Sequence, residues 1–263
     1  MDNFFKTYFS SPVINYLGRI KERRVFSKPP VFIGGCGRSG TSLLLSILSA
    51  HPKIFAVPHE TDAFTQWRNA EPGGKRGSSA YPLREDRLYR YLMTHHVPAE
   101  AWRWCEKRPY NVLYIKEILC YWPDSRFINI IRDARDVLTS CHPKRSDRYW
   151  IAPSRWIRDV SAGLKFKDHP HVLTIRYEDL ISDSDLIIKQ ICDFINEACV
   201  PEILHWYENA AVRKNRAWFG GLQPIHSGSV KKWERPEYNS RIESIMKNAQ
   251  IVKLLKELNY LSG

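Results

Sequence analysis

Short apolar runs, rich in β-branched residues, alternate along the chain with segments of helical periodicity. These runs are hydrophobic at nearly every position, which is typical of strands buried on both faces of a parallel sheet. We therefore predict an α/β fold with three layers (α/β/α), in which helices cover both faces of a central parallel sheet. The predicted strands are Val31–Gly34, Ile54–Val57, Val112–Ile115, Phe127–Ile131 and Val172–Ile175. The predicted helices are Gly40–Ala50, Ala134–Cys141, Ser154–Lys165, Ser184–Ile195 and Ser240–Glu257.

Two polar, basic segments interrupt this alternation. Residues 61–110 are rich in aromatic and basic side chains and contain the run PGGKRGSS, which is typical of a loop. Residues 218–236 are also basic and contain glycine. Long insertions in compact α/β domains commonly cover a functional site. We therefore interpret residues 1–263 as a single domain and expect these two segments to flank its site.

Residues 1–28 form an amphipathic N-terminal segment that ends in a basic cluster. Its spacing favours a helix packed on the domain, and peripheral contact with a membrane surface is the alternative. Polar residues and Pro12 interrupt its apolar positions, unlike those of a signal peptide. No run of about 18 apolar residues occurs, so we predict no membrane span. The six cysteines show no metal-binding spacing, and we expect a cytoplasmic protein with free thiols.

The charge balance predicts an anionic ligand without identifying it. The chain carries a formal net charge of +12 and has a pI of about 9.4. Such a charge attracts nucleic acid, acidic membranes and sulfated or phosphorylated ligands alike. The sequence contains no recognised nucleic-acid-binding module, so we expect no nucleic-acid partner. A basic binding module without catalysis is therefore the weakest of the interpretations.

The stretch VFIGGCGRSGTSLLLSIL, residues 31–48, reads as a buried strand, a glycine-rich turn and a helix start. Backbone N–H groups in such a turn, together with the positive end of the helix, bind phosphate. The pattern in nucleotide triphosphatases is G-x-x-x-x-G-K-[ST], but here Thr41 replaces the lysine and the basic residue is Arg38. Hydroxyl donors from Thr41 and Ser42 suit one phosphate without a metal ion. An ordinary tight turn between strand and helix is the alternative.

A second anion-binding element is predicted at the end of the strand Phe127–Ile131. Arg132 follows this strand directly, at the sheet edge where open α/β folds bind ligands. Ser140 lies about two helical turns further on, and with Lys144 it completes a candidate phosphate pocket. A phosphate-loop kinase would instead use Asp133 to bind magnesium, but the adjacent cation Arg132 disfavours a metal ion there. Ion pairing within the run RDARD is the structural alternative.

The order of these motifs resembles the sulfotransferase family that uses 3′-phosphoadenosine 5′-phosphosulfate (PAPS), from Val31 to Trp233. The family's 5′-phosphosulfate loop is matched by RSGTS, its 3′-phosphate element by RDARDVLTS, and later motifs by RYEDL and HSGSVKKWER. The resemblance implies PAPS as co-substrate, no metal ion, and a P-loop-like phosphosulfate-binding loop. It places Tyr177 near the adenosine. The implied donor-binding residues are Gly37, Arg38, Ser39, Gly40, Thr41, Ser42, Arg132, Ser140, Lys144, Tyr177, Ser227, Gly228, Lys232 and Trp233.

Three short runs, RSGT, AHP and ET, resemble the branch of tyrosylprotein and bacterial carbohydrate sulfotransferases. This resemblance implies that Glu60 is the base that takes the proton of the acceptor hydroxyl. It also implies that Lys116, after the predicted strand Val112–Ile115, neutralises the departing charge together with Arg38. His59 is the alternative base, because other members of the family use a histidine.

The implied reaction moves the sulfuryl group of PAPS to an acceptor hydroxyl and leaves 3′,5′-diphosphoadenosine (PAP). Residues 61–110 would form a lid on the acceptor side, and residues 218–236 would cover the donor. The aromatic and basic content of this lid suits a carbohydrate or glycolipid acceptor. Trp102 and Trp104 either form its acceptor wall or pack inside it. A tyrosylprotein or a small molecule is the alternative acceptor, and a phosphate-loop kinase is the weaker alternative activity.

Overall fold

Five parallel strands form the central sheet of the computed structural model, which describes residues 10–64, 84–142, 145–214 and 222–261. The strand order is β2-β3-β1-β4-β7, and every pairing in this sheet is parallel. The predicted α/β fold with a central parallel sheet is therefore confirmed. The strands are β1 (Val31–Gly35), β2 (Ile54–Ala56), β3 (Arg103–Lys107), β4 (Arg126–Ile131) and β7 (Val172–Arg176).

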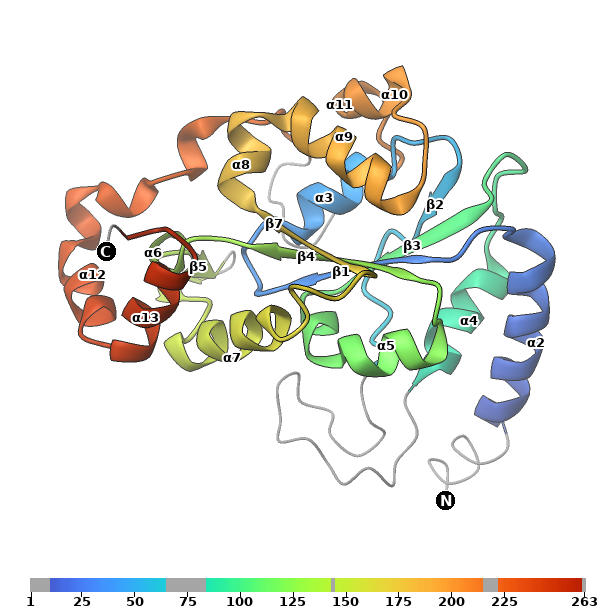
Figure 1. The fold of residues 1–263 in the computed structure, drawn as a ribbon, viewed down its shortest axis with the longest axis horizontal. Coiled ribbons are helices and arrows are strands. Elements are labelled where there is room, and N and C mark those ends of the chain that lie inside the picture. The colour runs from blue at the N-terminus through green and yellow to red at the C-terminus, as the bar shows by residue number, and fades with distance from the viewer. Residues whose placement is uncertain (1–9, 65–83, 143–144, 215–221, 262–263) are drawn as a thin grey trace.

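Helices cover both faces of this sheet (Figure 1). Val31 and Ile33 of β1 pack into a core with α3 and α9, whereas Phe32 between them packs into an aromatic core on the other face. This alternation follows from the opposite directions of successive side chains in a strand. One face is covered by α3 (Thr41–Leu48), α8 (Tyr177–Ser182), α9 (Ser184–Ile195), α10 (Pro201–Leu204) and α11 (Trp206–Asn209), the other by α5 (Ile115–Tyr121) and α7 (Pro153–Leu164).

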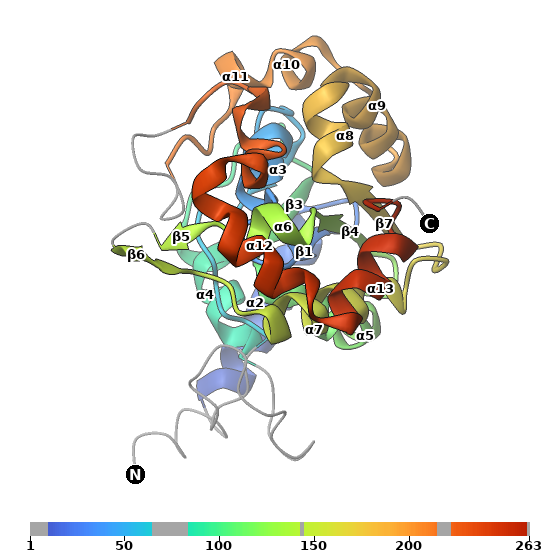
Figure 2. The same ribbon diagram turned by 90° about the vertical axis from the view of Figure 1, so that its left-hand side faces the viewer.

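The remaining elements lie at the two ends of the sheet. Figure 2 shows α12 and α13 in front of α6, with which they share a third hydrophobic core. A short antiparallel hairpin, β5–β6, lies next to α6 in the chain. The bounds are α2 (Ser11–Val25), α4 (Glu85–Thr94), α6 (Ala134–Leu138), β5 (Cys141–His142), β6 (Arg145–Tyr149), α12 (Asn239–Met246) and α13 (Ala249–Glu257). The described residues also form the 3-10 helices η2 (Pro109–Tyr114), η3 (Ser227–Ser229), η4 (Lys232–Glu234) and η5 (Pro236–Tyr238).

Two predicted elements are wrong. The apolar run Val112–Ile115 belongs to η2 and the start of α5 and is not a strand. The predicted helix Ser240–Glu257 is split into α12 and α13, because the Asn248 side chain accepts N–H bonds from Gln250 and Ile251 and begins a new helix. The other predicted strands and helices are present, with ends displaced by a few residues.

Strand β3 has no hydrophobic pattern although all five of its residues are buried. Its sequence is RWCEK, and each buried charge has a partner. Glu106 accepts a hydrogen bond of 2.7 Å from Asn111. Arg103 donates one of 2.6 Å to the Ile195 carbonyl at the end of α9. Pairing of this kind offsets the cost of burying charge, so a polar sequence can occupy the middle of the sheet.

Residues 61–110 do not form one continuous lid. Strand β3 lies inside the sheet between β2 and β1. Trp104 is wholly buried and donates a hydrogen bond of 2.8 Å to Glu22 of α2, so it is a core residue and not part of an acceptor wall. Trp102 directly precedes β3, at the amino-terminal edge of the sheet. Residues 65–83, which contain the run PGGKRGSS, lie outside the described residues.

The N-terminal segment contains the predicted helix, α2, and this helix is packed on the domain against α4. Gly18 allows close approach, since a Cβ there would lie 2.4 Å from the Tyr89 side chain. Glu22 turns toward the aromatic core and accepts hydrogen bonds from Tyr89, Trp104 and Trp122. None of the helices in the described part of the chain is long and apolar enough to cross a bilayer.

Candidate functional site

A cavity of about 1270 Å³ opens at the carboxyl ends of the parallel strands. Segments that are far apart in the sequence meet on its wall, as is expected for an α/β sheet of this kind. The wall includes the turn after β1, the segment after β2, the residue after β4 and the start of α8. It consists of Gly37, Arg38, Gly40–Leu43, Pro58–Glu60, Asp62, Pro109, Tyr110, Arg132, Trp150, Ile151, Arg155, Tyr177, Ile181, Lys214, Leu222–His226 and Ser229.

The turn after β1 has the backbone geometry of a phosphate-binding loop. Gly40 has a φ of +96°, and a Cβ there would lie 2.5 Å from the Tyr177 ring, so only glycine fits. Arg38 also adopts a left-handed conformation, with φ 71°, which for a non-glycine residue commonly marks a functional site. Helix α3 begins at Thr41, and its amino-terminal end borders the cavity. Beneath the wall, the Ser39 hydroxyl is buried and has no hydrogen-bond partner among the described residues.

Arg132 lies between this loop and the turn that contains Ser229. Its side chain donates a hydrogen bond of 2.9 Å to the Arg38 carbonyl and another to the Ser229 carbonyl. The guanidinium stacks on the Tyr177 ring at 4.3 Å, and the residue is 7% exposed. The Tyr177 hydroxyl and Ser229 Oγ are 2.7 Å apart. Arg132, which begins the predicted 3′-phosphate element, therefore contacts the predicted 5′-phosphosulfate loop directly, and both Arg132 and Tyr177 contact the turn that contains Ser229.

Two further predicted residues, Ser140 and Lys232, contact each other next to Arg132. Lys232 Nζ donates a hydrogen bond of 3.1 Å to Ser140 Oγ, although neither residue is on the cavity wall. Burial, with the nearby charges of Arg132 and Arg38, lowers the pKa of Lys232 to about 8. Burial and the charge of Arg132 also lower the pKa of Arg38. Three cations thus share a partly desolvated volume with the single carboxylate of Asp136, and their excess of positive charge favours an anionic ligand.

The remaining residues that were predicted to bind PAPS do not line the cavity or lie outside the described residues. Ser227 and Gly228 are exposed, and Ser229 is the residue of this turn that reaches the cavity wall. Trp233 stacks on an arginine of α6 instead of lining the cavity. Lys144 lies outside the described residues.

Glu60 and Lys107 form an ion pair next to the phosphate-binding loop. Lys107 Nζ lies 2.8 Å from Glu60 Oε1 and donates a hydrogen bond of 3.2 Å to Ser42 Oγ. The Lys107 side chain is 1% exposed and that of Glu60 is 41% exposed, so the carboxylate faces the cavity. The residue that sequence reasoning selected, Lys116, is exposed on α5 and is not on the wall. The reason is the incorrect strand assignment, since Lys107 is the lysine at a strand's carboxyl end.

His59 also lies on the cavity wall, so two candidate bases are present. The His59 ring packs edge-on against Tyr91, with centroids 4.5 Å apart. In contrast, Glu60 contacts the lysine that touches the start of α3. Geometry therefore favours Glu60 as the group closer to the predicted phosphosulfate.

A second part of the wall combines aromatic rings with guanidinium groups. Arg155 lies over the Tyr110 ring at 4.3 Å, and Arg38 lies over the Trp150 ring at 5.2 Å. Arg155 is oriented by Asp159 at 3.4 Å. Sequence reasoning missed Trp150 and Arg155, because they follow the hairpin β5–β6 and carry no motif. This part of the wall offers stacking surfaces and positive charge to a second ligand.

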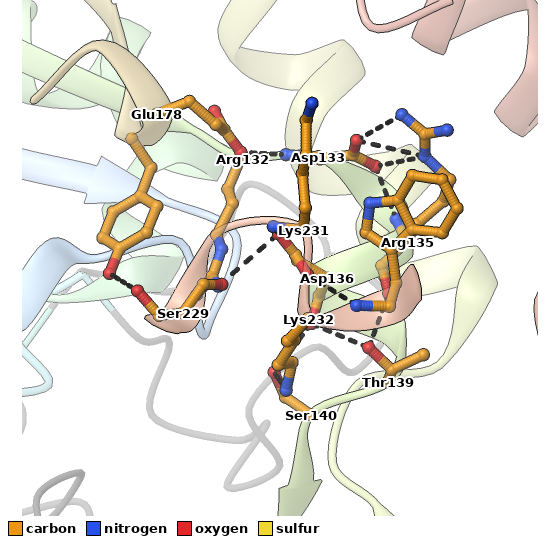
Figure 3. Close-up of polar contacts among 12 residues, drawn as sticks. Arg132, Asp133, Arg135, Asp136, Thr139, Ser140, Glu178, Ser229, Lys231 and Lys232 are labelled. Atoms are coloured by element: carbon orange, nitrogen blue, oxygen red, sulfur yellow. Dashed lines mark hydrogen bonds and ion pairs between the residues drawn. The ribbon is translucent and has the colours of Figure 1, made fainter. Parts of the chain in front are cut away.

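Asp133, the magnesium ligand in the kinase interpretation, is engaged elsewhere. Its carboxylate accepts a hydrogen bond of 2.8 Å from the Arg135 backbone at the start of α6. The Arg135 side chain donates to both of its oxygens, at 3.0 Å to Oδ1 and 2.6 Å to Oδ2 (Figure 3). Asp133 is not on the cavity wall. The geometry therefore does not support a kinase.

Comparisons with known proteins agree with this geometry. A family model described as the sulfotransferase family matches residues 29–201. Protein-tyrosine sulfotransferase of Drosophila melanogaster is 27% identical over 246 residues, which are 80% of this chain but only 49% of that protein. Thus the chain spans about half the length of this relative.

Solved structures share the fold at low sequence identity. The sulfotransferase domain of the Synechococcus PCC 7002 olefin synthase has a TM-score of 0.63 and is 20% identical, with 90% of this chain and 97% of that domain covered. Mouse sulfotransferase SULT7A1 complexed with PAP has a TM-score of 0.51 and is 16% identical, with 88% of each chain covered. At these identities the likeness concerns the fold.

Proposed function

Because this chain belongs to the sulfotransferase family, we propose that it transfers the sulfuryl group of PAPS to an acceptor hydroxyl. The observation that carries this proposal is the hydrogen bond of 2.9 Å from Arg132 to the Arg38 carbonyl, which brings two anion-binding elements together at neighbouring strand ends. The mouse relative of the same fold binds PAP. The residues fit such a ligand, since Arg132 lines the cavity and its Nε is buried without a hydrogen-bond partner in the described structure.

The two phosphate groups of the donor would occupy different parts of the cavity. The 5′-phosphosulfate would be held by the loop from Gly37 to Ser42, all of whose residues except Ser39 line the cavity. The 3′-phosphate would be held by Arg132, with Ser140 and Lys232 behind it. The adenosine would lie beside Tyr177.

The proposed chemistry needs one base and several cations. PAPS supplies the sulfuryl group. Glu60 takes the proton of the acceptor hydroxyl as the acceptor oxygen bonds to sulfur. The electron pair of the broken S–O bond stays on the 5′-phosphate of PAP, where Arg38, Lys107 and the loop N–H groups stabilise the charge. Lys107 thereby takes the role that the sequence resemblance implied for Lys116.

We propose a carbohydrate or glycolipid as the acceptor. Tyr110 and Trp150 supply aromatic faces that suit sugar rings, and Arg155 adds a positive charge beside them. A tyrosyl peptide is the second candidate, which the name of the Drosophila relative favours. Incubation with radiolabelled PAPS and a panel of glycosides, glycolipids and tyrosyl peptides separates the two, and labelling of the tyrosyl peptides alone would contradict the first.

The proposed donor can be tested by thermal stability. A ligand present at 100 times its dissociation constant raises the free energy of unfolding by about 2.7 kcal/mol. PAP should therefore raise the melting temperature of this protein, and ATP with magnesium should not. Differential scanning fluorimetry measures both. Stabilisation by ATP with magnesium in the absence of any effect of PAP would contradict the proposal.

Binding of PAP should take up protons near pH 8 because of Lys232. In the free protein its pKa is lowered to about 8, so at that pH about half of the Lys232 side chains are neutral. A bound phosphate favours the ammonium form, hence affinity should fall as the pH rises above this value. Calorimetry in two buffers of different ionisation enthalpy measures the uptake. Lys232→Arg should abolish it, and an unchanged uptake in this variant would contradict the assignment.

We also propose that α2 contacts an anionic membrane surface. Val13, Tyr16 and Leu17 are 57%, 67% and 49% exposed and lie on one side of this helix. The only acidic residue of α2, Glu22, is turned into the core, so its outward charges are all positive. Figure 1 shows α2 at the outer edge of the molecule. An exposed apolar stripe with basic residues is typical of helices that bind anionic lipid surfaces.

Vesicle sedimentation tests this contact. The protein should bind vesicles that contain phosphatidylglycerol more strongly than vesicles of phosphatidylcholine alone. Leu17→Asp should reduce this binding severalfold, since it places a charge on the apolar stripe. Leu186→Asp is the matched control, because Leu186 is 59% exposed on α9. Equal loss in both variants, or dimerisation through α2 without vesicle binding, would contradict the proposal.

A further inference from the structure

Asp136 of α6 lies beneath the turn that carries Lys232. Its carboxylate accepts the backbone N–H of Lys231 at 2.9 Å and that of Trp233 at 3.2 Å (Figure 3). Asp136 is 1% exposed. Lys231 adopts a left-handed conformation with φ 56°. One buried carboxylate therefore holds the residues on both sides of Lys232.

The backbone carbonyl of Asp136 contacts Ser140, the residue to which Lys232 donates a hydrogen bond. Ser140 Oγ donates a hydrogen bond of 2.9 Å to the Asp136 carbonyl. Lys232 Nζ in turn donates to Ser140 Oγ at 3.1 Å. Asp136 thus fixes the backbone of the turn through its side chain and the Ser140 hydroxyl through its carbonyl. The mutual position of Lys232 and Ser140 depends on this one residue.

Asp136 forms an ion pair with Arg132 in the free protein, but its charge is unfavourable for an anionic ligand. Asp136 Oδ2 lies 3.8 Å from Arg132 Nη2, in the part of the site assigned to a phosphate group. A negative charge there opposes the binding of an anion. Burial raises the pKa of Asp136, so the charge is also costly to the folded protein. A carboxylate in this environment needs a structural or functional benefit that outweighs both effects.

We propose that Asp136 is a positioning residue for donor binding, which holds the turn 231–233 so that Lys232 and Ser140 lie together behind Arg132, on the side of the 3′-phosphate. This inference rests on the proposed function. It assigns Asp136 no contact with the donor itself. Asp136 should therefore increase the affinity for PAP by positioning Lys232. Its negative charge alone would decrease that affinity.

A double-mutant cycle with PAP as the ligand tests this coupling. In the wild type, Lys232→Ala should weaken PAP binding about tenfold, since a charge-assisted hydrogen bond is lost. Asp136→Asn, which removes the charge and one acceptor at nearly constant volume, should also weaken PAP binding about tenfold. In the Asp136→Asn background, Lys232→Ala should then change affinity less than about twofold. Lys231→Ala is the matched control, because it removes an exposed ammonium group one residue away.

Proton uptake on PAP binding is a second measurement, and a general loss of stability would not change it. The titratable groups around Lys232 are Arg132, Arg38, Asp136, Cys141 and Tyr238. If Asp136 positions Lys232, Asp136→Asn should reduce the proton uptake near pH 8 to that of Lys232→Arg, measured by calorimetry on samples shown to be folded by circular dichroism. Tighter binding of PAP by Asp136→Asn, or additive effects in the cycle, would overturn the inference alone. A wild type that binds no PAP would overturn the proposed function as well.

Discussion

Glu60→Gln should lower the turnover of PAPS by a factor of about 10²–10⁴, the range for loss of a general base. The amide cannot take a proton from the acceptor hydroxyl. It still accepts a hydrogen bond from Lys107, which lies 2.8 Å from the carboxylate, so the local structure should persist. The affinity for PAP should remain within about twofold of the wild type. The rate is measured with radiolabelled PAPS and an acceptor that supports turnover by the wild type.

His59→Gln is the matched control for this experiment. His59 is adjacent to Glu60 and also lies on the cavity wall, but it packs against Tyr91. We expect a decrease of only a few-fold in turnover, because the side chain would not exchange the acceptor's proton. A large loss in His59→Gln, with turnover preserved in Glu60→Gln, would reverse the assignment of the base.

Arg132→Ala should weaken the binding of PAP by about 10²-fold. Hydrogen bonds to charged groups contribute about 1.5–3 kcal/mol each, and the Arg132 guanidinium can direct more than one of them to a phosphate. The side chain is 7% exposed and stacked on Tyr177, so it is held in place before a ligand arrives. This pre-organisation reduces the entropy that binding would otherwise cost. Calorimetry measures the two dissociation constants.

Adenosine 5′-monophosphate distinguishes local from general effects of Arg132→Ala. It lacks the 3′-phosphate, so its affinity should change little when Arg132 is replaced. Loss of affinity for both nucleotides to the same extent would indicate damage to the whole site. Arg132 also donates to the Arg38 and Ser229 carbonyls, hence a fall in melting temperature of a few degrees is expected in parallel.

The two elements that we predict to bind anions could be located from the sequence because each is local in it. The loop after β1 requires glycine at Gly40, where φ is +96°. Arg132 directly follows a fully hydrophobic strand, so its position at the sheet edge follows from the chain direction. A contiguous stretch of residues determines both features. Their resemblance to sulfotransferases identified the family, and the match of residues 29–201 confirms it.

Strand β3 shows where the sequence pattern fails. It is buried at all five positions but contains Arg103, Glu106 and Lys107, whose partners come from other parts of the chain. The apolar run Val112–Ile115 is a more regular strand candidate, yet it forms η2 and the start of α5. Hydrophobic periodicity indicates where apolar side chains are buried. It cannot indicate a charged side chain that is buried because folding brings a partner to it. The choice of Lys116 over Lys107 was a direct consequence.

By itself, the sequence of this protein determined the parallel α/β architecture, the phosphate-binding loop and the arginine that follows β4. These depend on hydrophobic periodicity and on backbone conformations that neighbouring residues impose. Only the tertiary structure decided that Lys107 pairs with Glu60 and that Asp136 holds the turn around Lys232. Such pairs join residues from different loops, and their distances depend on strand order and register. No local pattern in the chain specifies either.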